Sequence, residues 1–184
     1  NSFVVERTRQ RAMRSDALRR IASLAASTAT LDEILRFSAQ ELAHLFQCDF
    51  TAVFLAEEQL GELRLHRASV VGASEAAIES LARLHMDDPQ YRHTVSGSQK
   101  PYLSGRLSFA SRVLPVYQPL VDILQVESAI VVPLVHSDRS VGELMLGSRN
   151  TEFFNNYDLQ VVMTAAAQLA SAIENTARAS QTDE

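Results

Sequence analysis

Cysteine is almost absent from this chain of 184 residues, with Cys48 as its single example. One thiol excludes an internal disulfide and any metal site built from several cysteines, which favours a reducing compartment such as the cytoplasm. Lysine is also limited to one residue, Lys100, and we interpret the excess of arginine as coding bias rather than a binding signature. No apolar run approaches the roughly 20 residues of a membrane-spanning helix, and the charged start at Glu6–Arg11 is unlike a signal peptide. We therefore expect a cytoplasmic protein without membrane insertion.

Acidic side chains outnumber basic ones. The chain holds 22 Asp and Glu against 17 Lys and Arg, a formal net charge of −5, which argues against nucleic acid as a partner. The hydrophobic share of 46% and the charged share of 21% are typical of a soluble globular domain. The length suits a single buried core with helical extensions.

Helical periodicity dominates the first part of the chain. The segment from Val5 to Ser27 lacks glycine and proline and repeats apolar residues at helical spacing. Its first half is rich in arginine, which would suit phosphate or anionic lipid, but a solvated helix face is the simpler interpretation. Thr30 followed by Glu33 predicts a capping box at the start of a second helix.

The middle of the chain changes to strand periods. Residues 51–57 are apolar on both faces, as in a central strand, whereas Leu63 and Leu65 alternate with polar residues, as in a half-exposed strand. A helix is expected over 74–84, with Ser74 as its N-cap. Segments 129–135 and 141–147 predict an antiparallel hairpin, in which Pro133 marks a bulge or an outward-facing register.

A long stretch of mixed character, residues 85–127, settles into neither period. A connection of that length inside a compact domain is usually functional. It holds three of the four tyrosines, and aromatic walls with a few polar groups are typical of small-molecule pockets. The candidate ligand-binding residues are Tyr91, His93, Phe109, Arg112 and Tyr117. The arginines, which also include Arg92 and Arg106, would favour a carboxylate or phosphate on the ligand. The alternative is that these side chains only fill a second core.

The last helix is expected from Asn156 onward, with a heptad pattern of apolar residues. Together with the N-terminal helix, this pattern predicts the interface of a parallel homodimer. The candidate interface residues are Leu18, Ile21, Val162, Ala166, Leu169 and Ile173. The alternative is that the heptad packs only onto the domain's own sheet.

Four sequence fragments, in this order, resemble the GAF domain family. They are Thr30–Leu35, Cys48–Leu55, the hairpin of Glu127–Leu134 and Val141–Leu146, and Phe153–Leu159 with Ala166–Asn175. The resemblance implies an α+β, PAS-like fold with an antiparallel sheet of five or six strands. N- and C-terminal signalling helices would lie on one face of the sheet, and the irregular segment would cover a pocket on the other.

The resemblance also implies a division of the chain and a role. Residues 1–29 would form a signalling helix, 30–158 the domain core, and 159–184 the closing helix that continues into an output linker. We expect a sensory or regulatory domain of a bacterial signal-transduction protein, most often a histidine kinase. It would bind an unidentified small molecule, or relay a signal through a dimeric helical interface to a covalently linked effector domain. The alternative is a ligand-free structural connector.

Cyclic-nucleotide-binding members of the family share an Asn-Lys…Phe-x-x-x-Asp-Glu signature that this sequence preserves only in part. Asn150, Phe154 and Asp158 match, whereas Thr151 and Leu159 replace the lysine and the glutamate. The lysine–aspartate ion pair of the signature is therefore impossible. The three matching residues also suit structural roles in a turn, a hydrophobic staple and a helix N-terminus. We expect no cyclic nucleotide.

Other cofactors and catalysis are not expected either. Bilin-binding members attach the chromophore to a cysteine, usually in the covering segment, whereas Cys48 lies ahead of the first strand and suits a small buried residue. His85 and His93 share the covering segment with Asp87 and Asp88, at spacings that do not preform a metal or haem site. The sequence has no G-x-S-x-G, glycine-rich phosphate loop or H-E-x-x-H motif, and sulfoxide-reducing members need several cysteines. We therefore expect no enzyme activity, covalent bilin, haem or metal in this chain.

Overall fold

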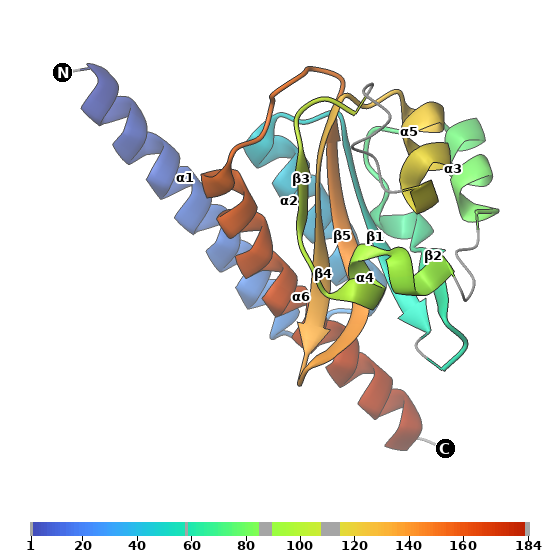
Figure 1. The fold of residues 1–184 in the computed structure, drawn as a ribbon. Coiled ribbons are helices and arrows are strands. Elements are labelled where there is room, and N and C mark those ends of the chain that lie inside the picture. The colour runs from blue at the N-terminus through green and yellow to red at the C-terminus, as the bar shows by residue number, and fades with distance from the viewer. Residues whose placement is uncertain (1, 58, 85–89, 108–114, 183–184) are drawn as a thin grey trace.

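A computed structural model of the protein describes residues 2–57, 59–84, 90–107 and 115–182 (Figure 1). A central sheet lies between a layer of long helices and a layer of short helices and turns. The elements are α1 (Ser2–Ala25), α2 (Leu31–Phe46), β1 (Phe50–Glu57), β2 (Glu62–Leu65), η1 (Arg67–Ser69), α3 (Glu75–Ala82), η2 (Gln90–His93), α4 (Val95–Ser98), β3 (Tyr102–Ser104), η4 (Pro115–Tyr117), α5 (Gln118–Leu124), β4 (Ser128–His136), β5 (Arg139–Ser148) and α6 (Asn156–Thr182).

The described part of the sheet has five antiparallel strands in the order β2-β1-β5-β4-β3. The predicted hairpin is β4–β5, closed by Ser137 (φ 50°) and Asp138 (φ 62°), two positive φ values that suit the twist of a two-residue hairpin turn. The bulge expected at Pro133 lies next to it, between Leu134 and Val135. The α+β architecture implied by the family resemblance is therefore confirmed, with five strands in the part of the chain that the structure describes.

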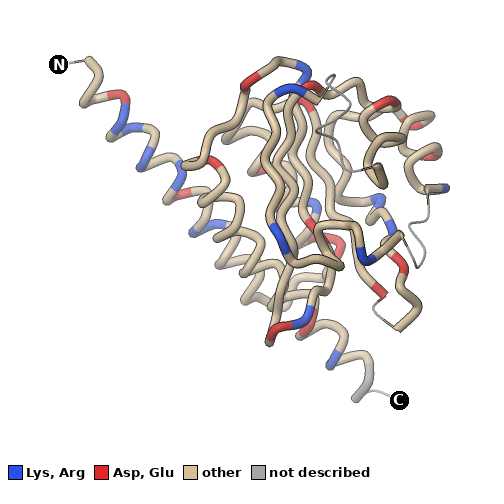
Figure 2. Tube along the Cα trace, in the orientation of Figure 1, with Lys and Arg blue, Asp and Glu red and all other residues tan. Residues whose placement is uncertain are grey.

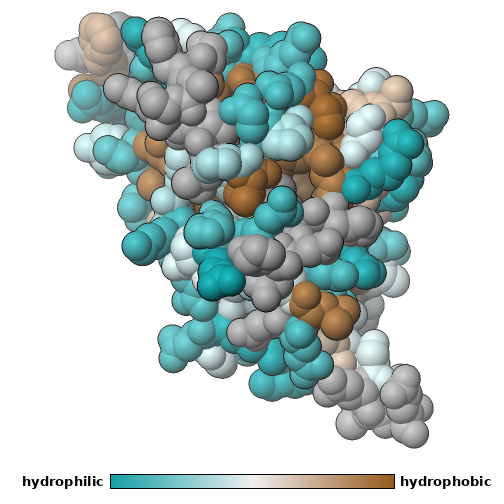
Figure 3. Space-filling view, turned by 45° about the vertical axis from the view of Figure 1, so that its right-hand side comes forward, coloured by the Kyte–Doolittle hydropathy of each residue, from teal (hydrophilic) through white to brown (hydrophobic). Residues whose placement is uncertain are grey.

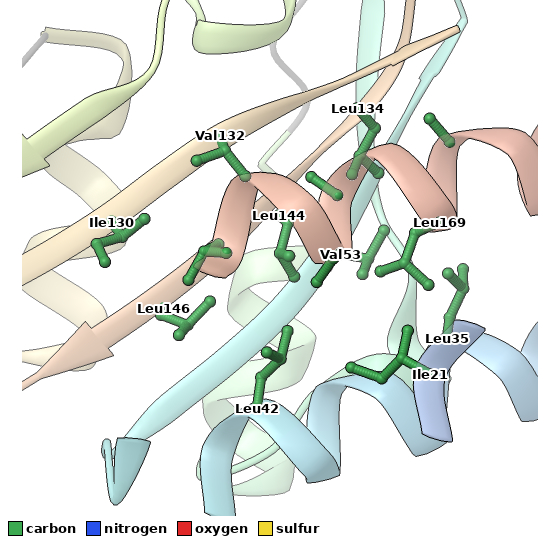
Figure 4. Close-up of a cluster of buried hydrophobic side chains, with 14 of the residues drawn as sticks. Ile21, Leu35, Leu42, Val53, Ile130, Val132, Leu134, Leu144, Leu146 and Leu169 are labelled. Atoms are coloured by element: carbon green, nitrogen blue, oxygen red, sulfur yellow. The ribbon is translucent and has the colours of Figure 1, made fainter. Parts of the chain in front are cut away.

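Helices α1, α2 and α6 cover one face of the sheet (Figure 1). The alternation of side chains along β1, β4 and β5 sends Val53, Val132 and Leu144 to this face, where they form one cluster with Leu42 of α2 (Figure 4). Thr30 caps α2 as predicted: its Oγ1 accepts from the Glu33 amide at 3.2 Å, and Glu33 Oε2 accepts from the Thr30 amide at 3.3 Å.

The heptad of α6 also faces this core. The residues predicted for a dimer interface were Leu18, Ile21, Val162, Ala166, Leu169 and Ile173. Leu169 and Ile21 are completely buried within the chain and point into the same cluster (Figure 4), while Leu18 and Ile173 pack partly against it. For Ile21, Val162, Ala166 and Leu169 this assignment is corrected, because side chains with almost no exposed surface cannot contact a second chain, whereas Leu18 and Ile173 keep part of their surface. The heptad instead follows the stripe that an amphipathic helix buries against its own sheet.

The N-terminal half of α1 extends past the rest of the domain, with its arginines distributed along the helix (Figures 1 and 2). Arg7, Arg9 and Arg11 are exposed, in agreement with the interpretation of a solvated helix face. Further along α1, Ala17 and Ile21 are its two buried residues. Among the described residues, no helix combines the length and hydropathy needed to cross a membrane.

The start of α6 explains one of the partial signature residues. Asp158 Oδ2 accepts from the Asn155 amide, and Asn155 Oδ1 accepts from the Asp158 amide, both at 2.9 Å. This reciprocal pair is a capping box that satisfies two backbone donors at the helix N-terminus. Asp158 therefore has the structural role that the sequence allowed.

Candidate functional site

The second face of the sheet is covered by α3, α4 and α5 with the turns between them (Figure 1). Beneath this covering layer lies a second hydrophobic cluster, separate from the one under the long helices. Phe54 of β1, Val131 of β4 and Met145 of β5 point into it from the sheet, while Leu120 and Leu124 of α5 point into it from above. The covering layer is thus held to the sheet mainly by apolar contacts.

One short helix of this layer is positioned by its N-cap. Thr94 Oγ1 accepts from the Gly97 amide at 3.0 Å and donates to the Tyr91 carbonyl at 2.6 Å. Gly97 passes so close to the Tyr91 carbonyl that a Cβ at this position would overlap with it. The local turn therefore requires glycine, and it directs the backbone amides of Val95 and Ser96 toward the sheet.

Glu143 is the polar centre of this face. It lies on β5 opposite Pro133 of β4 and Phe54 of β1, and it is completely buried. Its Oε2 accepts from the Ser96 amide at 2.8 Å, and its Oε1 accepts from the Tyr117 hydroxyl at 2.6 Å. Two separate parts of the covering layer, α4 and η4, are thus joined to one carboxyl group of the sheet.

Burial changes the acid–base behaviour of both side chains. Removal from water raises the pKa of Glu143 to about 7, although the hydrogen bonds from Tyr117 and the Ser96 amide oppose this shift. Burial, followed by the neighbouring Glu143 charge, raises the pKa of Tyr117 well above its ordinary value. Tyr117 therefore stays a phenol that donates its proton, while Glu143 can change its charge near neutral pH.

The structure brings together two of the five candidate ligand-binding residues. Tyr117 is 3% exposed and donates a hydrogen bond to Glu143. The Tyr91 hydroxyl lies 3.3 Å from the hydroxyl of Ser96, the residue of α4 whose amide also bonds Glu143. His93 is exposed, so it does not belong to this buried cluster. Phe109 and Arg112 lie outside the described residues.

The expectation that arginines of the covering segment bind an anionic ligand is not supported where they are described. Arg106 is about half exposed and pairs with Glu152 at 3.2 Å, and Arg92 is exposed as well. Among the described residues of this face, the buried charged group is a carboxyl, Glu143, rather than a guanidinium.

A small apolar cavity lies beside Tyr117, between α5 and the sheet. Its volume is about 20 Å³, enough for one water-sized group. Tyr102, Leu107, Tyr117, Val126 and Met145 are among its lining residues. An open groove of about 630 Å³ adjoins it along α5 and shares Leu107, Val121 and Val126 with the cavity. On the side of α3 and α5, hydrophobic atoms reach the surface between hydrophilic ones (Figure 3).

Sequence reasoning did not identify Glu143. A signal was nevertheless present, since Glu143 is the one charged residue between Arg139 and Arg149 and interrupts an apolar strand. Charged residues are rarely fully buried unless they are paired, so an acid in a central strand indicates a specific environment. Its partners could not be read from the sequence, because they lie 26 and 47 residues away.

The remaining candidates for cofactor chemistry have structural surroundings. Cys48 packs partly against the cluster under the long helices, and burial raises the pKa of its thiol, which disfavours the reactive thiolate. No group of three or more His, Cys, Asp or Glu side chains suitable for a metal ion occurs among the described residues.

Comparisons with known proteins identify the family and the fold of this domain. A GAF domain profile matches residues 30–175. The structure is similar to the GAF domain of a phosphoenolpyruvate-protein phosphotransferase from Coxiella burnetii, with a TM-score of 0.74, 17% identity, and coverage of 92% of this chain and 96% of the other. No curated protein sequence matches the chain.

Two further solved structures share the fold. One is free methionine-R-sulfoxide reductase from Neisseria meningitidis in complex with its substrate, with a TM-score of 0.70, 20% identity, and coverage of 91% of this chain and 92% of the other. The second is part of a methyl-accepting chemotaxis protein, with a TM-score of 0.65, 19% identity, and coverage of 85% and 96%. At these identities the likeness concerns the fold, while the profile spans most of the chain. The protein therefore belongs to the GAF domain family.

Proposed function

We propose that this domain is a non-catalytic sensor of a bacterial signal-transduction protein, and that it binds a small molecule beneath the α4–α5 covering layer. The observation that carries this proposal is the complete burial of Glu143, whose two hydrogen-bond donors come from separate parts of that layer. A group that binds beside Glu143 would compete with these two donors for its carboxyl group, so its binding would change how the layer is held.

A purely structural domain gains little from such a carboxyl. Burial of a charged group is costly even when it is hydrogen-bonded, and well-packed hydrophobic residues of similar volume often give equal or greater stability. Ionisable groups with strongly shifted pKa values are more common at functional sites than elsewhere. A regulatory role is also consistent with the chemotaxis protein that shares this fold.

Hydrogen bonds connect the covering layer with the last helix, and we propose that they transmit the binding event. Gln99, the C-cap of α4, donates from Nε2 to the carbonyl of Asp138 at the hairpin tip, at 3.0 Å. The next residue, Arg139, pairs with Glu174 of α6 at 3.0 Å. A shift of α4 would therefore reach the hairpin tip and then α6, which we propose leads to a covalently linked effector such as a histidine kinase.

We further propose a parallel homodimer through the outer faces of α1 and α6 rather than through the buried heptad. Val4, Val5 and Met13 of α1 and Met163 of α6 are between 38% and 66% exposed. These side chains offer apolar area on the two helices that flank the domain. In a parallel pair, a change in α6 of one chain would be matched in its partner.

The alternative function is a structural connector, and one observation favours it. The cavity beside Tyr117 holds only about 20 Å³, because the chain's own side chains fill the space beneath the covering layer. In a connector, Glu143 would simply join the covering layer to the sheet. No bound small molecule would then be needed for its function.

A metabolite screen with a matched variant separates the two functions. Wild-type protein and Glu143→Met, which keeps the side-chain volume but removes the carboxyl, are compared by thermal unfolding with a library of cytoplasmic metabolites. A sensor is expected to gain several degrees with at least one compound, and to lose that gain in Glu143→Met. If no compound stabilises the wild type, and Glu143→Met is more stable than wild type, the connector is the better description.

A further inference from the structure

We propose that the ligand is a small organic cation, a protonated amine or amidine on a ring-sized apolar body, which displaces the Tyr117 phenol and pairs with Glu143. This inference rests on the small-molecule sensing proposed above, and it names the chemistry of the ligand for that site.

The position of Tyr117 indicates the size of the ligand. Its side chain lines the apolar cavity, while its hydroxyl reaches Glu143 Oε1 at 2.6 Å. The phenol thus separates the cavity from the carboxyl group. It is an apolar ring with a hydrogen-bond donor at one end, so a compound of the same outline can take its place. With the ring displaced, its volume joins the cavity of about 20 Å³ and accommodates a six-membered ring.

The charge of the site indicates the polar group. Both hydrogen bonds to Glu143 come from neutral donors, a phenol and a backbone amide. Among the described residues, no Lys, Arg or His side chain bonds its carboxyl group. An ammonium or amidinium group that replaces the phenol hydroxyl would form a charge-assisted hydrogen bond, which is roughly twice as strong as a neutral one. A ligand carboxylate would instead face Glu143 with like charge.

The remaining geometry suits this exchange. The Ser96 amide bonds Oε2, the oxygen that Tyr117 does not use, so α4 can hold the carboxyl group in place while the ligand binds Oε1. A carboxylate has about four acceptor positions, and these two bonds use two of them. The Val95 amide, which donates to the Tyr117 hydroxyl at 2.8 Å, would lose this acceptor, so ligand binding would remove one of the two hydrogen bonds that hold the start of α4.

The test uses three probes that share one ring and are of similar size: benzylamine, benzyl alcohol and benzoate. Their affinities are measured by isothermal titration calorimetry and thermal shift on the whole domain at neutral pH. We expect benzylamine to bind the wild type at least tenfold more tightly than benzoate, with benzyl alcohol between them. Glu143→Gln should reduce benzylamine affinity to that of the alcohol. Tyr117→Ala should raise the affinity for benzylamine at least tenfold, because the competing phenol is gone. If Tyr117→Ala does not fold, Tyr117→Leu is measured in its place.

Equal binding of benzoate and benzylamine would overturn the proposal, as would unchanged benzylamine affinity in Glu143→Gln. Absence of benzylamine binding to the folded Tyr117 variant would also overturn it. The metabolite screen distinguishes the two levels of failure. If an uncharged or anionic metabolite stabilises the wild type and requires Glu143, the ligand class is wrong but the sensor stands. If neither a metabolite nor benzylamine binds, both proposals fail.

Discussion

Arg14 of α1 and Asp158 of α6 form an ion pair with 2.6 Å between Nη2 and Oδ1, although they lie 144 residues apart. The guanidinium of Arg14 also lies 5.8 Å from the centre of the Phe46 ring at the end of α2. Asp158 belongs to the capping box of α6 as well. One cluster therefore joins the first helix, the second helix and the start of the last.

Arg14→Ala is expected to loosen α1 from the domain. Because Asp158 is 6% exposed, it would lose a charged partner in a largely buried position, at a cost of about 1–3 kcal/mol. Hydrogen exchange should show faster exchange along α1, while the sheet stays protected. Arg20→Ala is the matched control: Arg20, also on α1, pairs with Glu41 of α2 but is about half exposed to solvent, so its loss should destabilise the protein much less than the loss of Arg14. Equal effects of the two changes would contradict this account.

Leu169→Glu is expected to unfold the domain. Leu169 is completely buried between α6 and the sheet, and an unpaired carboxylate there costs several kcal/mol, on the order of the whole stability. Circular dichroism should show loss of structure. Met163→Glu, on the 38% exposed outer face of α6, should leave the fold intact but weaken the proposed dimer, as measured by light scattering. A folded Leu169→Glu monomer would instead support an interface along the heptad.

The buried carboxyl predicts an unusual dependence of stability on pH. The pKa of Glu143 in the folded protein is about 7, above its ordinary value of 4.5. Its contribution to stability is therefore complete below pH 4.5 and is lost as the pH rises through about 7. The loss amounts to about 3 kcal/mol. The free energy of unfolding is measured with urea at about pH 4.5 and pH 8. In Glu143→Gln most of the wild-type difference between these two pH values should disappear. An unchanged pH profile in Glu143→Gln would show that Glu143 does not titrate in this range.

Tyr117→Phe tests the connection between the covering layer and the sheet. The change leaves the ring in place but removes the hydroxyl that donates to Glu143 and accepts from the Val95 amide. Two buried polar groups would lose a partner, so we expect a loss of about 1–3 kcal/mol in urea unfolding. Hydrogen exchange at α4 should become faster. Tyr157→Phe, at a position 78% exposed, is the control and should change neither measurement.

The hairpin tip offers a test of signal transmission. Arg139→Ala removes the ion pair with Glu174, and because Arg139 is about half exposed, stability should change by less than about 1 kcal/mol. With a stabilising ligand bound, hydrogen exchange of α6 should respond in the wild type but respond less in Arg139→Ala. The same response in both proteins would show that the signal does not reach α6 through the pair of Arg139 and Glu174. Arg64→Ala, which removes a pair with Glu62 on the edge strand β2, serves as control.

Local features of the fold were predictable from the sequence. The capping residues of α2 and α3, Thr30 and Ser74, act on backbone groups only three residues away, so their effect does not depend on the rest of the chain. The strand periods of β1 and of the β4–β5 hairpin were equally readable. Four sequence fragments in the right order indicated the family, and two of the site tyrosines, Tyr91 and Tyr117, were found from the composition of the covering segment.

The tertiary structure decided two points that the sequence left open: what the heptad of α6 packs against, and which groups surround Glu143. A heptad stripe buries the same side chains whether it meets a sheet or a second chain, and only the packing of α6 on β4 assigns Leu169 to the core. Glu143 became a candidate only when α4 and η4 were positioned over β5, since a carboxyl group acquires its hydrogen bonds and its shifted pKa from neighbours distant in the chain. The sequence by itself determined the elements and their amphipathic faces, because these depend on neighbouring residues. The site depends on which faces meet, and that depends on the whole chain.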